Sequence, residues 1–112
     1  MDVKSVMDSR KFSPEKLAKI SLFESEKMFC DVYGVSPGQE QKPHAHEDCD
    51  KVYYVVEGCA HFMVGGEHRE VGEKNVVYAP AGVEHSVKNA GSTNVTLLVL
   101  MTPHPNYVTK RP

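Results

Sequence analysis

Short runs of β-branched and aromatic residues alternate with polar positions along most of the chain, and glycine or proline separates the runs. Alternation with a period of two is typical of strands that bury one face. The pattern predicts eight strands, at residues 28–35, 39–46, 52–57, 60–64, 67–70, 75–79, 84–89 and 94–101. Many short strands with regular turn signals indicate an all-β sandwich or barrel.

The connections between these strands are consistent with the same fold class. Gly65-Gly66 is a strong hairpin signal, because glycine accepts the positive φ angles of a tight turn. Helical signal is scarce, and its best candidate is residues 13–19, with Ser13 at the cap and Pro14 at the first helical position. We expect at most this short N-terminal helix, or an irregular arm. The predicted organisation is a single domain, with an N-terminal arm over 1–27, a barrel over 28–101 and a C-terminal tail over 102–112.

The composition excludes several classes of function. The 112 residues suffice for one domain with one core, and 13 basic against 15 acidic side chains give a net charge of −2. No basic stripe favours nucleic-acid binding, and no apolar run reaches the ~18 residues that span a membrane. The N-terminus is polar, unlike a secretory signal. The three cysteines, Cys30, Cys49 and Cys59, lack the CxxC spacing of a zinc ribbon. They also do not suggest a disulfide framework, so we expect a cytoplasmic protein.

Three histidines are the most informative chemical feature. His44 and His46 flank a single residue, so in a strand both side chains would project from the same face. His85 lies about forty positions later, and a sheet that closes on itself would bring it to the first pair. Three neutral imidazoles leave coordination positions of a divalent transition metal open for water and substrate, as a catalytic site requires.

Two spaced motifs resemble those of the cupin superfamily in its small single-domain form, the type 2 conserved barrel. The first motif corresponds to Gly38, His44, His46 and Gly58, and the second to Pro80, Gly82, His85 and Asn89. The resemblance covers about residues 28–101. It implies a double-stranded β-helix, or jelly-roll barrel, with the three histidines as metal ligands.

The chain departs from the family pattern at two places. Lys51 occupies the position of the glutamate that is normally the fourth protein ligand, and Lys74-Asn75 replaces the usual Gly-Asp turn. Lys51 leaves three alternatives open. The site could be a three-histidine metal site in which Lys51 is displaced or faces substrate. A strand bulge could let Asp50, or less readily Asp48, supply the missing carboxylate. Finally, the histidines and Lys51 could line an organic pocket that holds no metal.

The resulting functional hypothesis is a small metal-binding cupin that takes iron, manganese, zinc or nickel. A redox-active metal would indicate a dioxygenase, and zinc or nickel an isomerase or lyase acting on a small organic substrate. Lys51 and Tyr53 are the candidate catalytic or pocket residues, and whether the protein is an enzyme stays open. The alternative is a metal-free binding or sensor module for a sugar or an organic acid. A third alternative is a purely structural oligomer building block. By analogy with other single-domain cupins, we expect a homodimer.

The remaining histidines and tyrosines carry weaker signals. We expect His61, His68 and His104 to be ordinary surface residues. Tyr53 should share the inward face with Lys51 if the strand is regular, and either lines the pocket or packs in the core. Tyr78 has the same two interpretations with less support.

Overall fold

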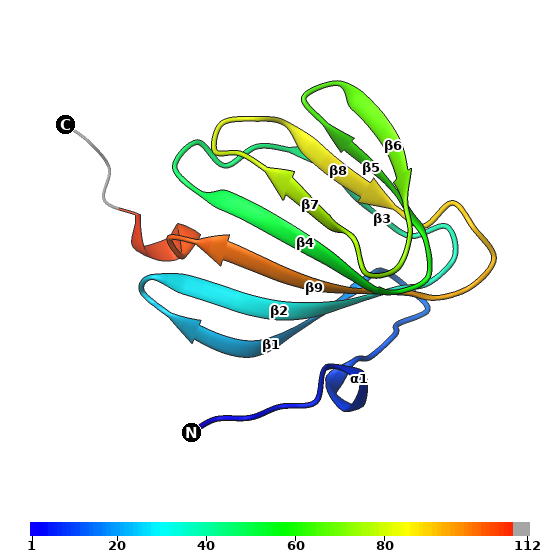
Figure 1. Cartoon of the computed structure of the whole chain (residues 1–112), viewed down its shortest axis with the longest axis horizontal. Coiled ribbons are helices and arrows are strands. Elements are labelled where there is room, and N and C mark those ends of the chain that lie inside the picture. Colours follow the sequence, from blue (N-terminus) through cyan, green and yellow to red (C-terminus); the bar gives the residue numbers. More distant parts are fainter. Residues whose placement is uncertain (109–112) are drawn as a thin grey trace.

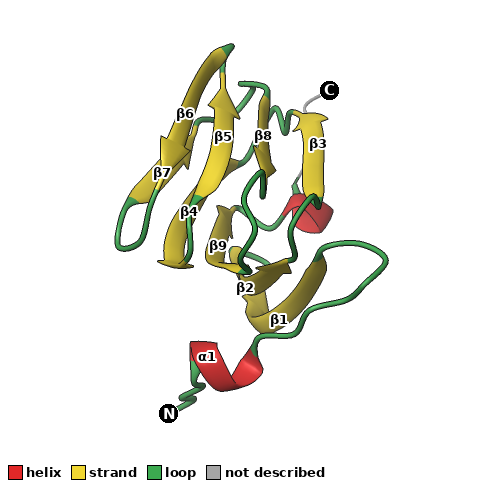
Figure 2. Ribbon diagram, turned by 90° about the vertical axis from the view of Figure 1, so that its right-hand side faces the viewer, coloured by secondary structure: helices red, strands yellow, loops and turns green. Residues whose placement is uncertain are grey.

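Two antiparallel sheets face each other in the computed structural model, which describes residues 1–108 (Figures 1 and 2). The first sheet has the order β1-β2-β9-β4-β7 and the second the order β3-β8-β5-β6. The strands are β1 (Ala18–Ser25), β2 (Met28–Val35), β3 (Glu40–His44), β4 (Asp50–Glu57), β5 (Ala60–Val64), β6 (Glu67–Val71), β7 (Val76–Ala79), β8 (His85–Lys88) and β9 (Val95–Thr102). This is the predicted all-β double-stranded β-helix.

The two sheets leave two open sides between their edge strands (Figure 2). Strands β6 and β7 flank one open side, and β1 and β3 flank the other. A short 3-10 helix, Pro105–Tyr107, follows β9. The described residues contain no helix with the length and hydrophobicity that a membrane crossing requires.

The N-terminal region differs from the prediction. Residues 13–17 are irregular, which agrees with the arm and not with the candidate helix over 13–19, and the α-helix α1 lies earlier, at Val6–Ser9. The side chain of Ser5 caps it by accepting a hydrogen bond from the Asp8 amide at 3.1 Å. Residues that were assigned to the N-terminal arm contribute strand β1, which pairs with β2. Its central Leu22 is 5% exposed, so burial of this strand outweighs the weak helical signal before it.

The core lies between the sheets and is built from inward-facing residues of both. In β4 the burial pattern alternates, so Lys51, Tyr53 and Val55 all point inward. Tyr53 and Lys51 therefore share a face, as the regular alternation predicted. The fully buried cluster contains Tyr33, Val35, Tyr53, Val55, Ala60, Phe62, Ala79, Val87, Val95, Leu97 and Val99. Lys51 extends the same inward row beyond this apolar cluster, toward the histidines.

Two backbone positions explain local sequence choices. Gly34 allows the N-terminal segment to cross β2, because a Cβ there would lie 1.8 Å from the carbonyl oxygen of Lys11. Lys74 adopts a φ of 66°, which is the left-handed region that favours glycine. Glycine is the residue that the cupin pattern described above has at this turn, which agrees with the left-handed conformation.

Candidate functional site

The three predicted histidines lie together at one end of the core. His44 ends β3 and His85 begins β8, and the two are direct cross-strand partners with ring centroids 4.3 Å apart. His46 lies in the loop after β3, with its ring 5.1 Å from that of His44 and 6.2 Å from that of His85. The strand therefore ends earlier than predicted. The loop is fixed by the His46 carbonyl oxygen, which accepts a hydrogen bond from the Gly82 amide at 2.9 Å.

Hydrogen bonds fix the tautomers of two of these imidazoles. The Nδ1 of His44 lies 2.8 Å from the Lys42 carbonyl oxygen, and the Nδ1 of His85 lies 2.9 Å from the Val83 carbonyl oxygen. A carbonyl oxygen can only accept, so each Nδ1 carries the proton and each neutral ring keeps its lone pair on Nε2. Backbone carbonyls orient metal-ligating histidines in this way.

The environment keeps these rings neutral. Burial lowers the pKa of His44 to about 4, and it also lowers the pKa of His46 and of His85. The Lys51 ammonium contributes to all three shifts in the same direction. The Nε2 of His85 is buried and has no hydrogen-bond partner among the described residues. A buried lone pair without a donor is costly, so this nitrogen keeps an unused capacity to accept a hydrogen bond or to coordinate a metal.

The arrangement is close to the geometry of a metal centre without reaching it. Within residues 1–108, no three His, Cys, Asp or Glu side chains converge tightly enough to hold an ion. Imidazoles that share one metal at ~2.1 Å have ring centres roughly 4.5–5.5 Å apart. His44 lies near this separation from both other rings, whereas the 6.2 Å between His46 and His85 is longer. A rotation of the half-buried His46 ring toward the other two is the adjustment that coordination would require.

Lys51 points into the barrel and is 1% exposed. Its Nζ donates to the Oε1 of Gln41 at 3.1 Å, and the hydroxyl of Tyr53 donates to the same oxygen at 3.2 Å. The ammonium also lies 5.6 Å from the ring centroid of Tyr33 and 4.9 Å from that of Tyr53. Burial, assisted by the charge of Lys19, lowers the pKa of Lys51 to about 7.

Asp50 faces away from the histidines. Its Oδ1 accepts hydrogen bonds from the Tyr78 hydroxyl at 3.1 Å and from the Ala81 amide at 2.9 Å. The bulge proposed at the start of β4 is absent, because Asp50 and Lys51 pair in regular register with Thr102 and Met101. The register of β4 shifts only between Val55 and Glu57, at the other end of the strand. Asp50 therefore anchors the turn before β8, and Asp48 is exposed in the loop.

A cleft of about 360 Å³ opens beside His46 and Lys51, and we call it the histidine cleft. Strands β1, β2, β3, β4 and β9 and the C-terminal 3-10 helix contribute to its walls. Besides His46 and Lys51, its polar lining includes Lys19, Asp31, Tyr33, Gln41 and His104. Sequence reasoning missed Gln41 and Tyr33, since a single glutamine or tyrosine in a strand carries no signal of what faces it.

His104 was predicted at the surface, and that prediction is wrong. The side chain is buried, its Nε2 lies 3.1 Å from a carboxylate oxygen of Glu24, and its ring packs edge-on against Phe29. The tail therefore folds back on the β1–β2 hairpin. In contrast, His61 and His68 lie on the outer face of the β5–β6 hairpin, as predicted.

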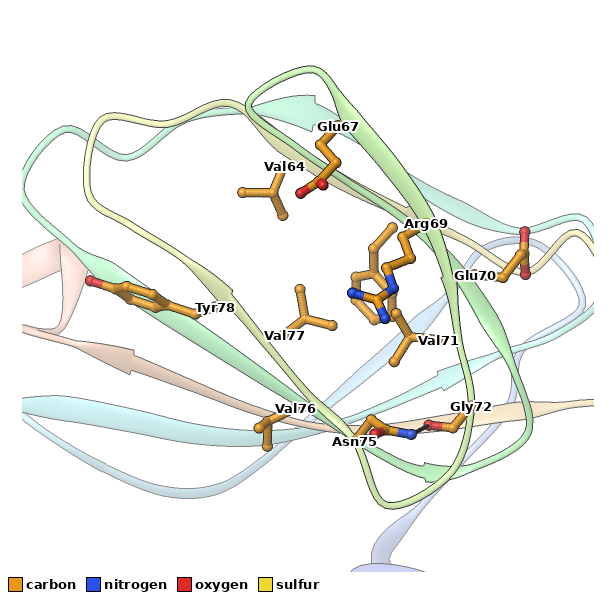
Figure 3. Close-up of a pocket in the computed structure, with 11 residues that line it drawn as sticks. Val64, Glu67, Arg69, Glu70, Val71, Gly72, Asn75, Val76, Val77 and Tyr78 are labelled. Atoms are coloured by element: carbon orange, nitrogen blue, oxygen red, sulfur yellow. Dashed lines mark hydrogen bonds between the residues drawn. The ribbon is translucent and has the colours of Figure 1, made fainter.

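A second hollow lies on the opposite open side (Figure 3). This β6–β7 groove has a volume of about 350 Å³ and shares no lining residue with the histidine cleft. Figure 3 shows Val64, Val71 and Val77 around its floor, with the Arg69 side chain among them and Tyr78 at one end. Tyr78 is 56% exposed, so it belongs to this side of the molecule and not to the histidine cleft.

The chain matches known proteins along most of its length. A family model described as a cupin domain matches residues 32–101. A crystal structure of a Thermus thermophilus protein superposes with a TM-score of 0.90 at 42% identity and covers 92% of this chain and 98% of that one.

Two curated relatives are also similar in sequence. An uncharacterized protein of Streptomyces coelicolor is 36% identical over 88 residues, which is 77% of this chain and 80% of that protein. An oxalate-binding protein of Thermotoga maritima is 25% identical over 85 residues, which is 76% of this chain and 69% of that protein. The family model and the 36% identical relative both cover most of the barrel, so the chain belongs to the cupin family.

Proposed function

We propose that this cupin binds one divalent transition metal through His44, His46 and His85 and takes a small organic molecule in the histidine cleft. The observation that carries the proposal is the buried Nε2 of His85, which has no partner among the described residues although its Nδ1 is held by a carbonyl. His44 has the same Nδ1 anchor. Nitrogen ligands favour iron, manganese, zinc or nickel over magnesium or calcium.

Different residues of the chain would have different roles at this site. A bound metal would supply Lewis acidity, and a redox-active one would also supply electrons for oxygen chemistry. Lys51 would contact the substrate from the β4 wall, and the Oε1 of Gln41 accepts hydrogen bonds from both Lys51 and the fully buried Tyr53. The apolar cluster behind Tyr53 excludes water from one side of the site. Dioxygenase activity is the proposal for a redox-active metal, and isomerase or lyase activity is the proposal for zinc or nickel.

Elemental analysis of the purified protein tests this proposal. We expect about one equivalent of a transition metal in the parent protein and a loss of that metal in His44→Ala. His61→Ala is the matched control, because His61 lies on the outer face of the same sheet and should leave the metal content unchanged. An equal metal content in His44→Ala and the parent protein would contradict the proposal.

The second candidate is a metal-free binding module for a sugar or an organic acid. Lys51 favours it, since an ammonium at the position of the family's glutamate repels a cation. A ligand that binds chelator-treated protein with the affinity of untreated protein would support this candidate. For either candidate we propose a cytoplasmic homodimer, and light scattering at micromolar concentration measures the oligomeric state.

A further inference from the structure

Lys51 has a buried amino group that no carboxylate of the described residues contacts. An ammonium has three donors, and the Oε1 of Gln41 is the acceptor that it reaches, at 3.1 Å. No carboxylate in residues 1–108 lies within 4.0 Å of its Nζ. Burying an ion costs several kcal/mol unless a counter-charge and hydrogen bonds compensate it. A carboxylate supplied from outside the chain would compensate the ammonium form of Lys51.

The amino group of Lys51 lies at the wall of the histidine cleft. Tyr33 and Tyr53 flank the Nζ with their ring faces, and the Gln41 amide oxygen fixes it from β3. Lys51 and His46 both form part of the wall of the 360 Å³ histidine cleft. A small molecule in the cleft can therefore contact the ammonium and the imidazole at the same time.

The other charged groups that line the cleft are less buried than Lys51. Lys19 is exposed, and its Nζ lies 5.4 Å from the centroid of the Tyr33 ring that Lys51 also approaches. Two carboxylates, Asp31 and Glu24, oppose the lysines. Glu24 is already in contact with the Nε2 of His104, whereas Asp31 forms no ion pair within 4.0 Å among the described residues. Two lysines and two carboxylates therefore line the cleft, and Lys51 is the most deeply buried of these four groups.

We propose that the ligand of the histidine cleft is a small organic acid whose carboxylate forms an ion pair with the Lys51 ammonium, while Lys19 at the mouth accelerates its arrival. The inference uses the cleft of the proposed function and names the chemical class of its ligand. It does not depend on the metal, because the ion pair with Lys51 forms in metal-free protein as well. Gln41 orients the ammonium, because its Oε1 accepts a hydrogen bond from the Nζ of Lys51.

Calorimetric titration of chelator-treated and of metal-loaded protein tests the inference. The probes are acetate, malonate and succinate, each at constant ionic strength and each paired with its neutral amide. We expect the acids to bind and the amides to bind at least tenfold more weakly. Lys51→Met and Lys51→Gln should each weaken acid binding at least tenfold, with thermal melts confirming the fold. Lys88→Met is the matched control, because Lys88 is exposed on the outer face of β8 and should leave affinity unchanged.

Kinetics separate the roles of the two lysines. In stopped-flow measurements, Lys19→Met should lower the association rate and its salt dependence while leaving the dissociation rate unchanged, as expected of a charge at the rim. Lys51→Met should raise the dissociation rate. Amides that bind as tightly as the acids, an absence of acid binding in both protein forms, or parent-like affinity in Lys51→Met would each overturn the inference. Acid binding by a protein that never takes up metal would refute the proposed metal site and leave this inference standing.

Discussion

The histidine cleft and the β6–β7 groove have nearly the same volume, about 360 and 350 Å³, but are lined by different kinds of side chain. In the histidine cleft, Lys51 is almost completely buried, and the adjoining His85 has an unpartnered Nε2. The groove instead has a valine floor and an exposed rim that includes Tyr78 and Glu67. The two hollows therefore differ in their buried polar atoms with unused hydrogen-bonding capacity and not in volume, which is why the histidine cleft is the proposed ligand site.

The difference follows from where each hollow sits in the barrel. The β6–β7 groove lies between two edge strands, and solvent can satisfy the polar groups there. The histidine site lies inside the layers, where β3, β4 and β8 direct side chains toward one another. Folding has already removed the polar groups of the histidine site from water. Substitutions there should therefore change stability and binding more than substitutions in the β6–β7 groove.

The largest expected effect is on metal affinity. His85→Ala should lower the affinity for the bound metal by roughly 100-fold or more, because it removes a ligand and its carbonyl-anchored orientation. Arg69→Ala in the β6–β7 groove should leave metal affinity unchanged. Competition against a chromophoric chelator measures both variants, and a similar affinity of His85→Ala and Arg69→Ala would remove the contrast between the two hollows.

A smaller effect is expected on stability and its dependence on pH. In metal-free protein, Lys51→Met should raise the free energy of unfolding near pH 7 by about 1–4 kcal/mol, because it removes an uncompensated buried charge. The folded-state pKa of Lys51 is lowered to about 7 from an ordinary value of 10.5, so between these values the unfolded chain binds more protons. The stability of the parent protein should therefore fall as the pH is lowered from about 10.5 to 7 and level off below it.

Denaturant titrations at several pH values measure this loss of stability between pH 10.5 and 7. Lys51→Met should flatten the pH dependence in that window, whereas Arg69→Met should keep it. A parent protein whose stability is constant from pH 7 to 10.5 would show that the Lys51 ammonium is well solvated or paired in solution.

The smallest effect separates two tyrosine hydroxyls. Tyr53→Phe should lower the free energy of unfolding by about 1 kcal/mol, because the buried hydroxyl donates a hydrogen bond to Gln41. Tyr78→Phe should not change the unfolding midpoint measurably, although its hydroxyl also donates a hydrogen bond, since water replaces the lost contact with Asp50. Equal midpoint shifts in the two variants would indicate that the hydroxyl of Tyr53 is more hydrated than its burial suggests.

The sequence predicted the architecture well because strand alternation and turn residues are short-range features that can be recognised along the chain. The bounds of β2 and β5 match the alternation along residues 28–35 and 60–64, and Gly65-Gly66 forms the predicted turn. Strand β1 was missed because the cap-like Ser13-Pro14 pair competed with a short alternation around Leu22. Tertiary pairing with β2 decided the outcome.

The site was only partly predictable, for a physical reason. The histidine pattern predicted that His44, His46 and His85 lie together, and their ring centroids are 4.3 to 6.2 Å apart. Which face Lys51 takes depends on the register of β4 against β9, and that register is a long-range property. The Gln41 contact and the burial of His104 likewise depend on strands and a tail that meet only in the folded chain.

The most direct test of the account is an anomalous X-ray diffraction measurement at the absorption edge of the metal that the purified protein contains. We expect one strong anomalous peak within about 2.0–2.2 Å of the Nε2 atoms of His44, His46 and His85, with His46 turned toward the other two rings. A peak on the outer-face pair His61 and His68, or crystals without a peak at the histidine cleft when grown with equimolar metal, would contradict it.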